Sequence, residues 1–447
     1  MNYDAAVRYL LTLGRELAAP TQAAAAKFDL ENITILSERL GRPDRAYPSA
    51  HIAGTNGKGS TAAFLESILR CAGFRTGLNT SPHLERINER IRVNGEEISG
   101  AAFGRTLTRI QVLIEELLAE GRLRAHPTYF ECVTAMAFEH LARERVEFGV
   151  FEVGLGGRLD ATNILAPVVT LITRVDFDHE NFLGHSLPEI AAEKAGILKP
   201  GVPLILAEQR PEAREVILAR ALKLNCPVID IASAFRIDRE ESENGCFRAG
   251  ITDTASGWSL EIAPQLPGRF QVHNALSAVA AARVLRDRGF RISDDAIIQG
   301  IAGAVWPGRL EKVHSRPDLY FDGAHNPSAA RELAAFWEQN FSGRRIWLLF
   351  GALRDKAVDE IAGILFPYAA EVIFTQPQTS RAISVSQLAE ITAHHAKHSI
   401  IVPDASSALE YALGRAAPED AIFVTGSLYL VGQLRHLWKN RVQVAAR

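Results

Sequence analysis

A glycine- and lysine-rich stretch at residues 51–61, HIAGTNGKGST, constrains the fold more than any other part of the sequence. Apolar, strand-like residues lead into it, and residues 61–71 have the apolar spacing of a helix. Glycines let backbone N–H groups turn toward an anion, the helix N-terminus adds partial positive charge, and Lys58 can reach the outer phosphates. The stretch predicts a nucleoside triphosphate site made by Gly54, Thr55, Asn56, Gly57, Lys58, Gly59, Ser60 and Thr61.

This glycine loop departs from the strict phosphate-loop pattern in two places. Only two residues separate Gly54 from Gly57, and Gly59 stands between Lys58 and Ser60. A glycine-rich turn with a solvent-facing lysine is therefore a second interpretation, because short glycine motifs occur by chance. The rest of the chain favours the phosphate site.

Short apolar runs alternate with helical patterns along the chain, which indicates mostly parallel sheets covered by helices on both faces. In such sheets, ligands bind at the carboxyl ends of the strands. The glycine loop, Ser81, the loop at 154–160 and the Asp178–His179 pair each follow the end of a predicted strand. We therefore expect these four segments to meet at one rim.

The length of 447 residues is too great for one ordinary core, and we expect two α/β domains. The irregular segment AVWPGRLE predicts the linker between them. We place a mostly parallel sheet domain at 1–305, the linker at 306–311, and a smaller α/β domain at 312–447 with a polar loop at 322–327. We also expect an exposed loop at 85–99, a small hairpin region at 235–265 and a helix that starts near Asn274.

Composition argues against several classes of partner. The net charge of −3 provides no basic field for a polyanion, so nucleic acid is not expected. The four cysteines form no Cys-x-x-Cys pair, which argues against a zinc knuckle or a disulfide framework. The start of the chain lacks signal-peptide features, and no apolar stretch approaches the roughly 20 residues that span a bilayer. We expect a cytoplasmic monomer without a membrane partner.

A bound triphosphate needs Mg²⁺, which prefers oxygen ligands. The candidate ligands near the predicted rim are Ser81, Glu131, Asp176 and Asp178. His179 either binds a second metal ion or is a hydrogen-bonded structural histidine, and the residues alone leave both open. Similarly, Glu152 fits a carboxylate that fixes a loop, and Arg158 and Asp160 fit a local ion pair.

Ten motifs together resemble the folylpolyglutamate synthase and dihydrofolate synthase family of the Mur ligase superfamily, over residues 28–430. They are HIAGTNGKGST, TSPHL with ERINERI, TYFE, FEVGLGGRLDATN, DFDHENFLG, EKAGILK, GRFQVHNA, GRLE, DGAHNP and FGALRDK. The resemblance implies a P-loop-type first domain, a Rossmann-like second domain, and an amide ligase that uses ATP as co-substrate and two Mg²⁺ ions. The ligase would phosphorylate a folate or dihydropteroate carboxylate, and the amino group of L-glutamate would attack the acyl phosphate.

Two other functions remain open at this point. One is another Mur-type ligase that acts on a UDP-sugar peptide, which the Lys-Gly-Ser order of the loop disfavours. The other is a P-loop regulatory ATPase, which would not need an acidic and histidine cluster together with a second domain.

The resemblance also implies roles for single residues. Lys58 would hold the phosphates, Ser81 and Glu131 one Mg²⁺ ion, and His179 a second. Further nucleotide contacts would come from Asn274, Arg309, Asp322 and His325. The folate or pteroate contact region would include Phe28, Leu30, Arg158, Asp160 and Ala161. No short signature identifies the residues that bind glutamate.

Lys194 has two interpretations. Beside Glu193 on a helix, it fits a solvent-facing lysine. In the family that the chain resembles, this position of the EKAG motif is a lysine carbamylated by CO₂, which would give the second Mg²⁺ an anionic oxygen ligand. Carbamylation requires an uncharged amine, so the site must lower the pKa of Lys194.

Overall fold

A sheet of eight strands, with the order β4-β3-β2-β5-β1-β6-β7-β8, organises the first part of the chain. The structure, a computed structural model, describes residues 1–13 and 29–445. The strands from β2 to β8 in this order run parallel, and β3 and β4 run antiparallel. Their bounds are β1 Ser49–Ala53, β2 Thr76–Asn79, β3 Ile91–Val93, β4 Glu96–Glu97, β5 Phe148–Glu152, β6 Val169–Ile172, β7 Leu204–Leu206 and β8 Val228–Asp230.

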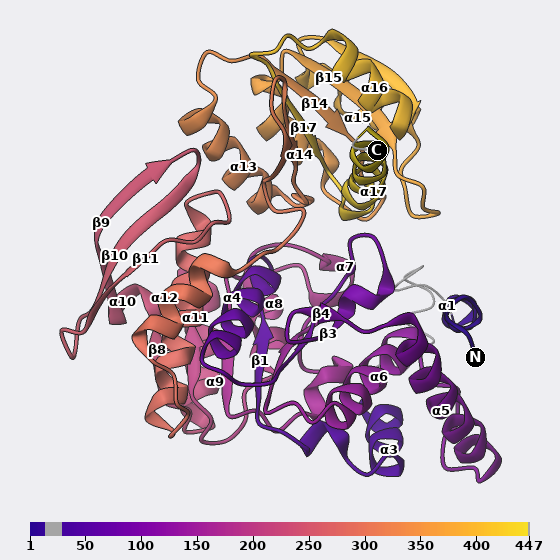
Figure 1. The fold of residues 1–447 in the computed structure, drawn as a ribbon, viewed down its shortest axis with the longest axis vertical. Coiled ribbons are helices and arrows are strands. Elements are labelled where there is room, and N and C mark those ends of the chain that lie inside the picture. Colours follow the sequence, from indigo (N-terminus) through magenta and orange to yellow (C-terminus); the bar gives the residue numbers. More distant parts are fainter. Residues whose placement is uncertain (14–28, 446–447) are drawn as a thin grey trace.

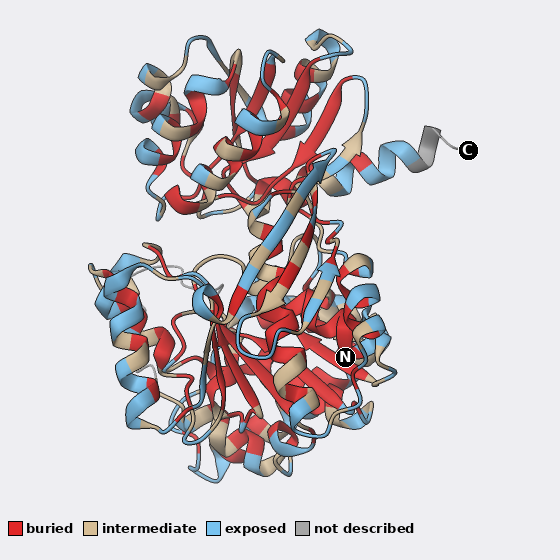
Figure 2. Ribbon diagram, turned by 90° about the vertical axis from the view of Figure 1, so that its left-hand side faces the viewer, coloured by how far each residue is buried: buried red, intermediate tan, exposed pale blue. Residues whose placement is uncertain are grey.

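Helices cover both faces of this sheet, because its strands are apolar on both sides. Along β7, Ile205 packs on one face, and Leu204 and Leu206 pack on the other. One face carries α4 (Lys58–Cys71), α11 (Phe270–Asp287) and α12 (Asp294–Gly303). The other carries α1 (Tyr3–Thr12), α3 (Glu31–Arg39), α5 (Gly100–Ala119), α6 (Tyr129–Arg143), α8 (Leu187–Ala195) and α9 (Pro211–Lys223). Figure 2 shows the strands buried and the outer helix faces exposed.

The hairpin region predicted at 235–265 is a three-stranded antiparallel sheet of β9 (Phe235–Glu243), β10 (Cys246–Asp253) and β11 (Ser259–Ile262). It extends from the first sheet toward α13 (Pro327–Asn340) (Figure 1). At its tip, a Cβ on Gly245 would lie 2.6 Å from the ring of Phe336 on α13. The tip therefore packs against the second half of the chain.

A second sheet, with the order β12-β13-β17-β14-β15-β16, organises the rest of the chain and is parallel except for β12. Its strands are β12 Glu311–His314, β13 Asp318–Phe321, β14 Ile346–Phe350, β15 Glu371–Gln376, β16 Ser399–Asp404 and β17 Ala421–Thr425. One face packs on α13, α14 (Val358–Leu365) and α15 (Val385–Thr392), and the other on α16 (Ala405–Arg415) and α17 (Leu428–Ala445). We call the parts built on the two large sheets the first unit and the second unit.

The α/β fold class predicted from the sequence is confirmed, but two local expectations are wrong. Residues 85–99 are not an exposed loop, because Ile87, Ile91 and Ile98 are buried and Arg90 is only 2% exposed. The many charged residues of this segment suggested exposure, although three of its isoleucines belong to the core. Helix α11 begins at Phe270, one turn before Asn274. The predicted division into 1–305, a linker at 306–311 and 312–447 stays a proposal. The first strand of the second sheet, β12, begins at Glu311.

No helix within residues 1–13 and 29–445 is long and apolar enough to cross a membrane.

Candidate active site

The four segments predicted to meet at one rim line a single cleft of about 1070 Å³. Gly54, Ser81, Gly154 and Asp178, which follow β1, β2, β5 and β6, all line it. The opposite wall belongs to the second unit, whose loop at 322–327 contributes four of its residues. The cleft therefore lies between the carboxyl ends of the first sheet and the polar loop of the second unit.

The glycines of the phosphate loop are required by close neighbours. Gly57 has a φ of 87° and caps α4, and a Cβ there would lie 2.3 Å from Oδ1 of Asn274. A Cβ on Gly59 would lie 2.7 Å from Nε1 of Trp306. Side chains at these positions would push α11 and the segment after α12 away from the loop. The departures from the strict pattern thus fit contacts particular to this fold.

Two lysines share one carbonyl at the start of this loop. Lys58 donates to the Gly54 oxygen at 3.1 Å and to the Thr55 oxygen at 3.2 Å, and Lys194 donates to the Gly54 oxygen at 2.9 Å. Lys194 on α8 is 4% exposed, so its interpretation as a solvent-facing lysine is wrong. Burial, assisted by the charge of Lys58, lowers the pKa of Lys194 to about 7. Its amine therefore loses its proton far more readily than an ordinary lysine.

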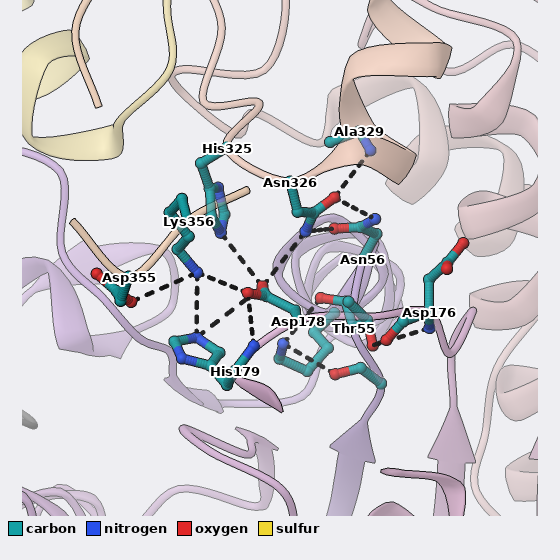
Figure 3. A network of polar contacts seen from close by, with 12 residues as sticks. Thr55, Asn56, Asp176, Asp178, His179, His325, Asn326, Ala329, Asp355 and Lys356 are labelled. Carbon is teal, nitrogen blue, oxygen red and sulfur yellow. Dashed lines mark hydrogen bonds and ion pairs between the residues drawn. The ribbon is translucent and has the colours of Figure 1, made fainter. Parts of the chain in front are cut away.

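Asp178 is the centre of a polar network that joins the two units (Figure 3). Its carboxylate accepts from Lys356 at 2.6 Å and from Asn326 at 3.3 Å, and it lies 3.6 Å from His325 Nε2. Burial raises the pKa of Asp178, but Lys356 and His325 more than offset this and hold it well below its usual value. The carboxylate is thus an anion at neutral pH.

His179 follows Asp178 in a left-handed conformation, with a φ of 52° that a residue with a side chain rarely adopts. Its Nδ1 is buried without a hydrogen-bond partner. Burial lowers the pKa of His179 to about 4, so the imidazole is neutral at neutral pH. Its Nε2 lies 3.5 Å from the ammonium group of Lys356, so a metal-binding role and a hydrogen-bonded structural role both stay open.

Three further polar side chains, Ser81, Glu131 and Glu152, line the cleft near the phosphate loop. The hydroxyl of Ser81 is buried without a partner, and its backbone N–H donates to Glu152 at 3.1 Å. Glu152 therefore fixes the Ser81 loop, as its position at a strand end indicated. Glu131 accepts from the N–H and the hydroxyl of Thr128 at 2.7 and 2.9 Å, and burial raises its pKa.

The second unit reaches the phosphate loop through amides. The side chains of Asn56 and Asn326 exchange two hydrogen bonds, of 3.2 and 3.0 Å. Asp322 accepts from the backbone N–H groups of Leu310 and Ala324, both at 2.9 Å, and so ties the 322–327 loop to the segment before β12. Arg309 lines the cleft beside this loop. The nucleotide-contacting residues expected in both units therefore share one space.

The remaining expected nucleotide contacts lie close by. Thr55 donates its hydroxyl to the Asp176 carbonyl oxygen at 2.9 Å, and the Asp176 N–H donates back at 3.0 Å. Ser60 is buried in the first turn of α4, and the hydroxyl of Thr61 donates to the backbone carbonyl oxygen of Asn274 at 3.5 Å. Asp176 itself does not line the cleft, although one of its carboxylate oxygens is buried without a partner.

The predicted folate contacts are only partly brought together. Asp160 and Ala161 line the cleft, and Asp160 accepts from the N–H groups of Gly154 and Leu155 at 3.0 and 2.9 Å. Arg158 also lines the cleft, and it pairs with Glu193 at 2.9 Å, so a local ion pair between Arg158 and Asp160 is wrong. Leu30 caps α3 and packs on the core there, whereas its neighbours at 29 and 31 line the cleft. Phe28 lies outside the described residues.

Sequence reasoning missed two residues that cross the cleft, Lys356 and Asn326. Lys356 lies in the FGALRDK motif, and its side chain is only 5% exposed. Asn326 lies in DGAHNP beside the expected His325. Both motifs are visible in the sequence, but which of their polar residues face the first unit depends on how the two units pack.

The fold and this site define a Mur-type ligase architecture. The family model of the Mur ligase middle domain matches residues 52–282, and that of the Mur ligase glutamate ligase domain matches residues 308–428. The chain belongs to the folylpolyglutamate synthase and dihydrofolate synthase family of Mur ligases.

Close relatives cover nearly the whole chain. The dihydrofolate synthase/folylpolyglutamate synthase of Bacillus subtilis is 36% identical over 90% of this chain and 92% of its own length. The structure of Mycobacterium tuberculosis folylpolyglutamate synthase complexed with ADP is 32% identical over 98% of both chains, with a TM-score of 0.88. That of E. coli FolC in complex with DHPP and ADP is 30% identical over 99% of this chain and 98% of the other, with a TM-score of 0.85.

Proposed function

We propose that this chain is an ATP-dependent ligase that joins L-glutamate to a carboxylate of dihydropteroate or a folate through an acyl phosphate. One observation carries the proposal. Asp178, beside the phosphate loop, is bonded to Lys356 and Asn326 of the second unit within the same cleft. A nucleotide held by the loop would thus lie next to the charges of the second unit, where a second and a third substrate can meet it.

The cleft offers oxygen and nitrogen ligands that fit Mg²⁺. The buried, unpartnered hydroxyl of Ser81 and the carboxylate of Glu131 would hold one ion, and His179 and Lys194, which also line the cleft, would hold a second. When bound, these ions would neutralise charge on the phosphoryl group in transfer. The fit rests on the two orphaned polar atoms, because buried polar groups normally have partners.

Two steps follow for the substrates. A carboxylate oxygen of the folate attacks the terminal phosphorus, and ADP leaves. The amino nitrogen of glutamate then attacks the acyl carbon, phosphate leaves, and the nitrogen loses its proton. Lys58 neutralises the phosphates in the first step. We assign the carboxylates of the incoming glutamate to Lys356, whose ammonium group is buried against Asp178 at the second-unit wall.

Lys194 is the residue for which chemistry and position agree most closely. At a pKa of about 7, much of its amine is uncharged at neutral pH. The uncharged amine would add CO₂ to form a carbamate and release one proton. The carbamate N–H can still donate to the Gly54 oxygen, which Lys194 contacts at 2.9 Å, and its carboxylate would replace a cation with an anionic ligand for Mg²⁺.

A panel of substrates with mass-spectrometric detection of product and parallel measurement of phosphate release tests the function. We expect phosphate release only when glutamate and either dihydropteroate or a reduced folate are present, with a product heavier by one glutamate residue. The member of the panel that reacts identifies the acceptor. Reaction of a UDP-sugar peptide would identify another Mur-type ligase, and ATP hydrolysis that ignores both substrates would identify a regulatory ATPase.

A further inference from the structure

The loop that follows Ser81 packs against the second unit. The side chain of Leu84 packs against the core that the second sheet forms with α17. A Cβ on Gly308 would be 3.2 Å from Leu84, and a Cβ on Gly432 only 1.8 Å from the Leu84 carbonyl oxygen. Glycine at 432 therefore allows α17 to lie directly on the backbone of a first-unit loop.

Charged groups close around this contact. Glu85 is paired with both Arg435 and Lys439 of α17, the latter at 2.7 Å. Arg435, with a side chain only 12% exposed, also holds both carboxylate oxygens of Glu311 at 2.6 and 2.8 Å. Glu311 in turn accepts from the Gly308 N–H at 2.9 Å. One arginine thus connects the Ser81 loop, α17 and the start of the second sheet.

The Ser81 loop is rigid enough to transmit this contact. Three successive N–H groups, of residues 84–86, donate to the carboxylate of Glu89 at 2.7, 2.8 and 2.8 Å. At the other end of the loop, the N–H of Ser81 donates to Glu152. Between these anchors the Ser81 hydroxyl is buried without a partner and lines the cleft. Because the loop is fixed at both ends, a displacement of Leu84 should also displace Ser81.

We propose that Leu84 and Arg435 are positioning residues through which docking of the second unit sets the Ser81 hydroxyl for Mg²⁺. Assembly of the metal site and closure of the cleft are then one event, since the same loop serves both. This inference rests on the role of Ser81 in the proposed function. It predicts a defect in metal affinity that an ordinary contact between two units would not produce.

The experiment measures Mn²⁺ affinity by electron paramagnetic resonance in the presence of ADP, and ADP affinity in EDTA, for the full-length chain. Arg435→Ala and Leu84→Ala should each weaken Mn²⁺ binding about 10-fold, as loss of outer-shell support does. ADP affinity in EDTA should stay unchanged. Arg435→Lys should fall between, because an ammonium group cannot hold two carboxylates as a fork. Arg441→Ala, which removes an exposed ion pair on the same helix, is the matched control.

If Arg435→Ala does not fold, Leu84→Ala still tests the proposal. The Leu84→Ala variant removes only the apolar contact and leaves every ion pair in place. Unchanged Mn²⁺ affinity in the folded variants, with or without loss of activity, would overturn the positioning role. Ser81→Ala separates the two levels of the argument. If it weakens Mn²⁺ binding and the other variants do not, only the coupling fails. If it has no effect, the metal role of Ser81 in the proposed function fails as well.

Discussion

The two walls of the cleft hold their polar groups in different ways. The phosphate loop on the first-unit wall relies on main chain, because its glycines open α4 and two lysines meet at the Gly54 carbonyl oxygen. The second-unit wall relies on side chains, because Asn326 and Lys356 reach across to Asn56 and Asp178. A main-chain site is formed whenever the first unit is folded, whereas the side-chain contacts exist only when the units are docked.

The difference separates two kinds of effect. Changes on the first wall should damage phosphoryl transfer itself, since every turnover uses the nucleotide. A change at Lys356 on the second wall should damage the step that needs glutamate and should leave nucleotide affinity nearly intact.

The largest effect is expected for Lys58→Ala. Loss of a positive charge that stabilises the transferred phosphoryl group should lower kcat/KM for ATP by about 1000-fold or more. The fold should persist, because Lys58 hydrogen bonds only to two carbonyl oxygens of its own loop among the described residues. Steady-state kinetics with circular dichroism checks this, and turnover close to wild type would remove the phosphate-site assignment.

Lys194→Ala should lower kcat by about 100-fold, the scale of losing one preorganised electrostatic contact. Acetate should restore part of the activity, because a small carboxylate can take the place of the carbamate in the cavity. Lys194→Arg should not respond to acetate, since a guanidinium group fills the space and stays charged. An active Lys194→Ala enzyme, or equal rescue of both variants, would argue against carbamylation.

Lys356→Ala should raise KM for glutamate by about 10-fold or more, because a charge-assisted contact to its carboxylate is lost. ADP affinity should change little. Lys312→Ala is the matched control, because Lys312 pairs with Asp318 on the same unit and has a side chain 40% exposed. An effect of Lys356→Ala on ADP affinity as large as that on glutamate would erase the division between the two walls.

The smallest effect concerns folding stability against pH. The pKa of Lys194 is about 7 in the folded chain, against an ordinary value of 10.5. Between these values the unfolded chain binds a proton that the folded chain lacks, so folding stability should increase as pH rises from about 7 toward 10.5. The contribution of one group is at most about 1.4 kcal/mol per pH unit.

Urea unfolding in CO₂-free buffer across this range measures the effect, with Lys194→Met as the comparison. The variant should have a flatter dependence of unfolding free energy on pH than the natural chain. Equal slopes would mean that the amine of Lys194 is not held uncharged by its burial.

The sequence predicted the first wall well, because strand ends and glycine loops leave local signals. The rule that ligands lie at the carboxyl ends of parallel strands predicts that Ser81 and Asp178 meet, as they do. On the second wall, the sequence predicted the 322–327 loop with Asp322 and His325, but not the contacts of Asn326 and Lys356. The sequence around Lys356 has no helical or strand pattern that would distinguish this lysine from a solvent-facing one. Its partner Asp178 is 178 residues away in the sequence.

The prediction that residues 85–99 form an exposed loop was wrong for a related physical reason. Its charges looked like those of an exposed loop, yet Glu89 accepts from three N–H groups of its own loop, and Arg90 is buried. Charges that are satisfied within a segment, or by a distant element such as α17, cannot be told from solvated ones by composition.

Transfer of oxygen from the folate carboxylate to phosphate tests the central claim most directly. An acceptor whose reacting carboxylate is labelled with ¹⁸O is incubated with ATP, glutamate and enzyme, and the released phosphate is examined by mass spectrometry. An acyl phosphate formed in the cleft predicts one ¹⁸O atom in inorganic phosphate for each amide bond made. Phosphate free of label, with amide product formed, would contradict the account.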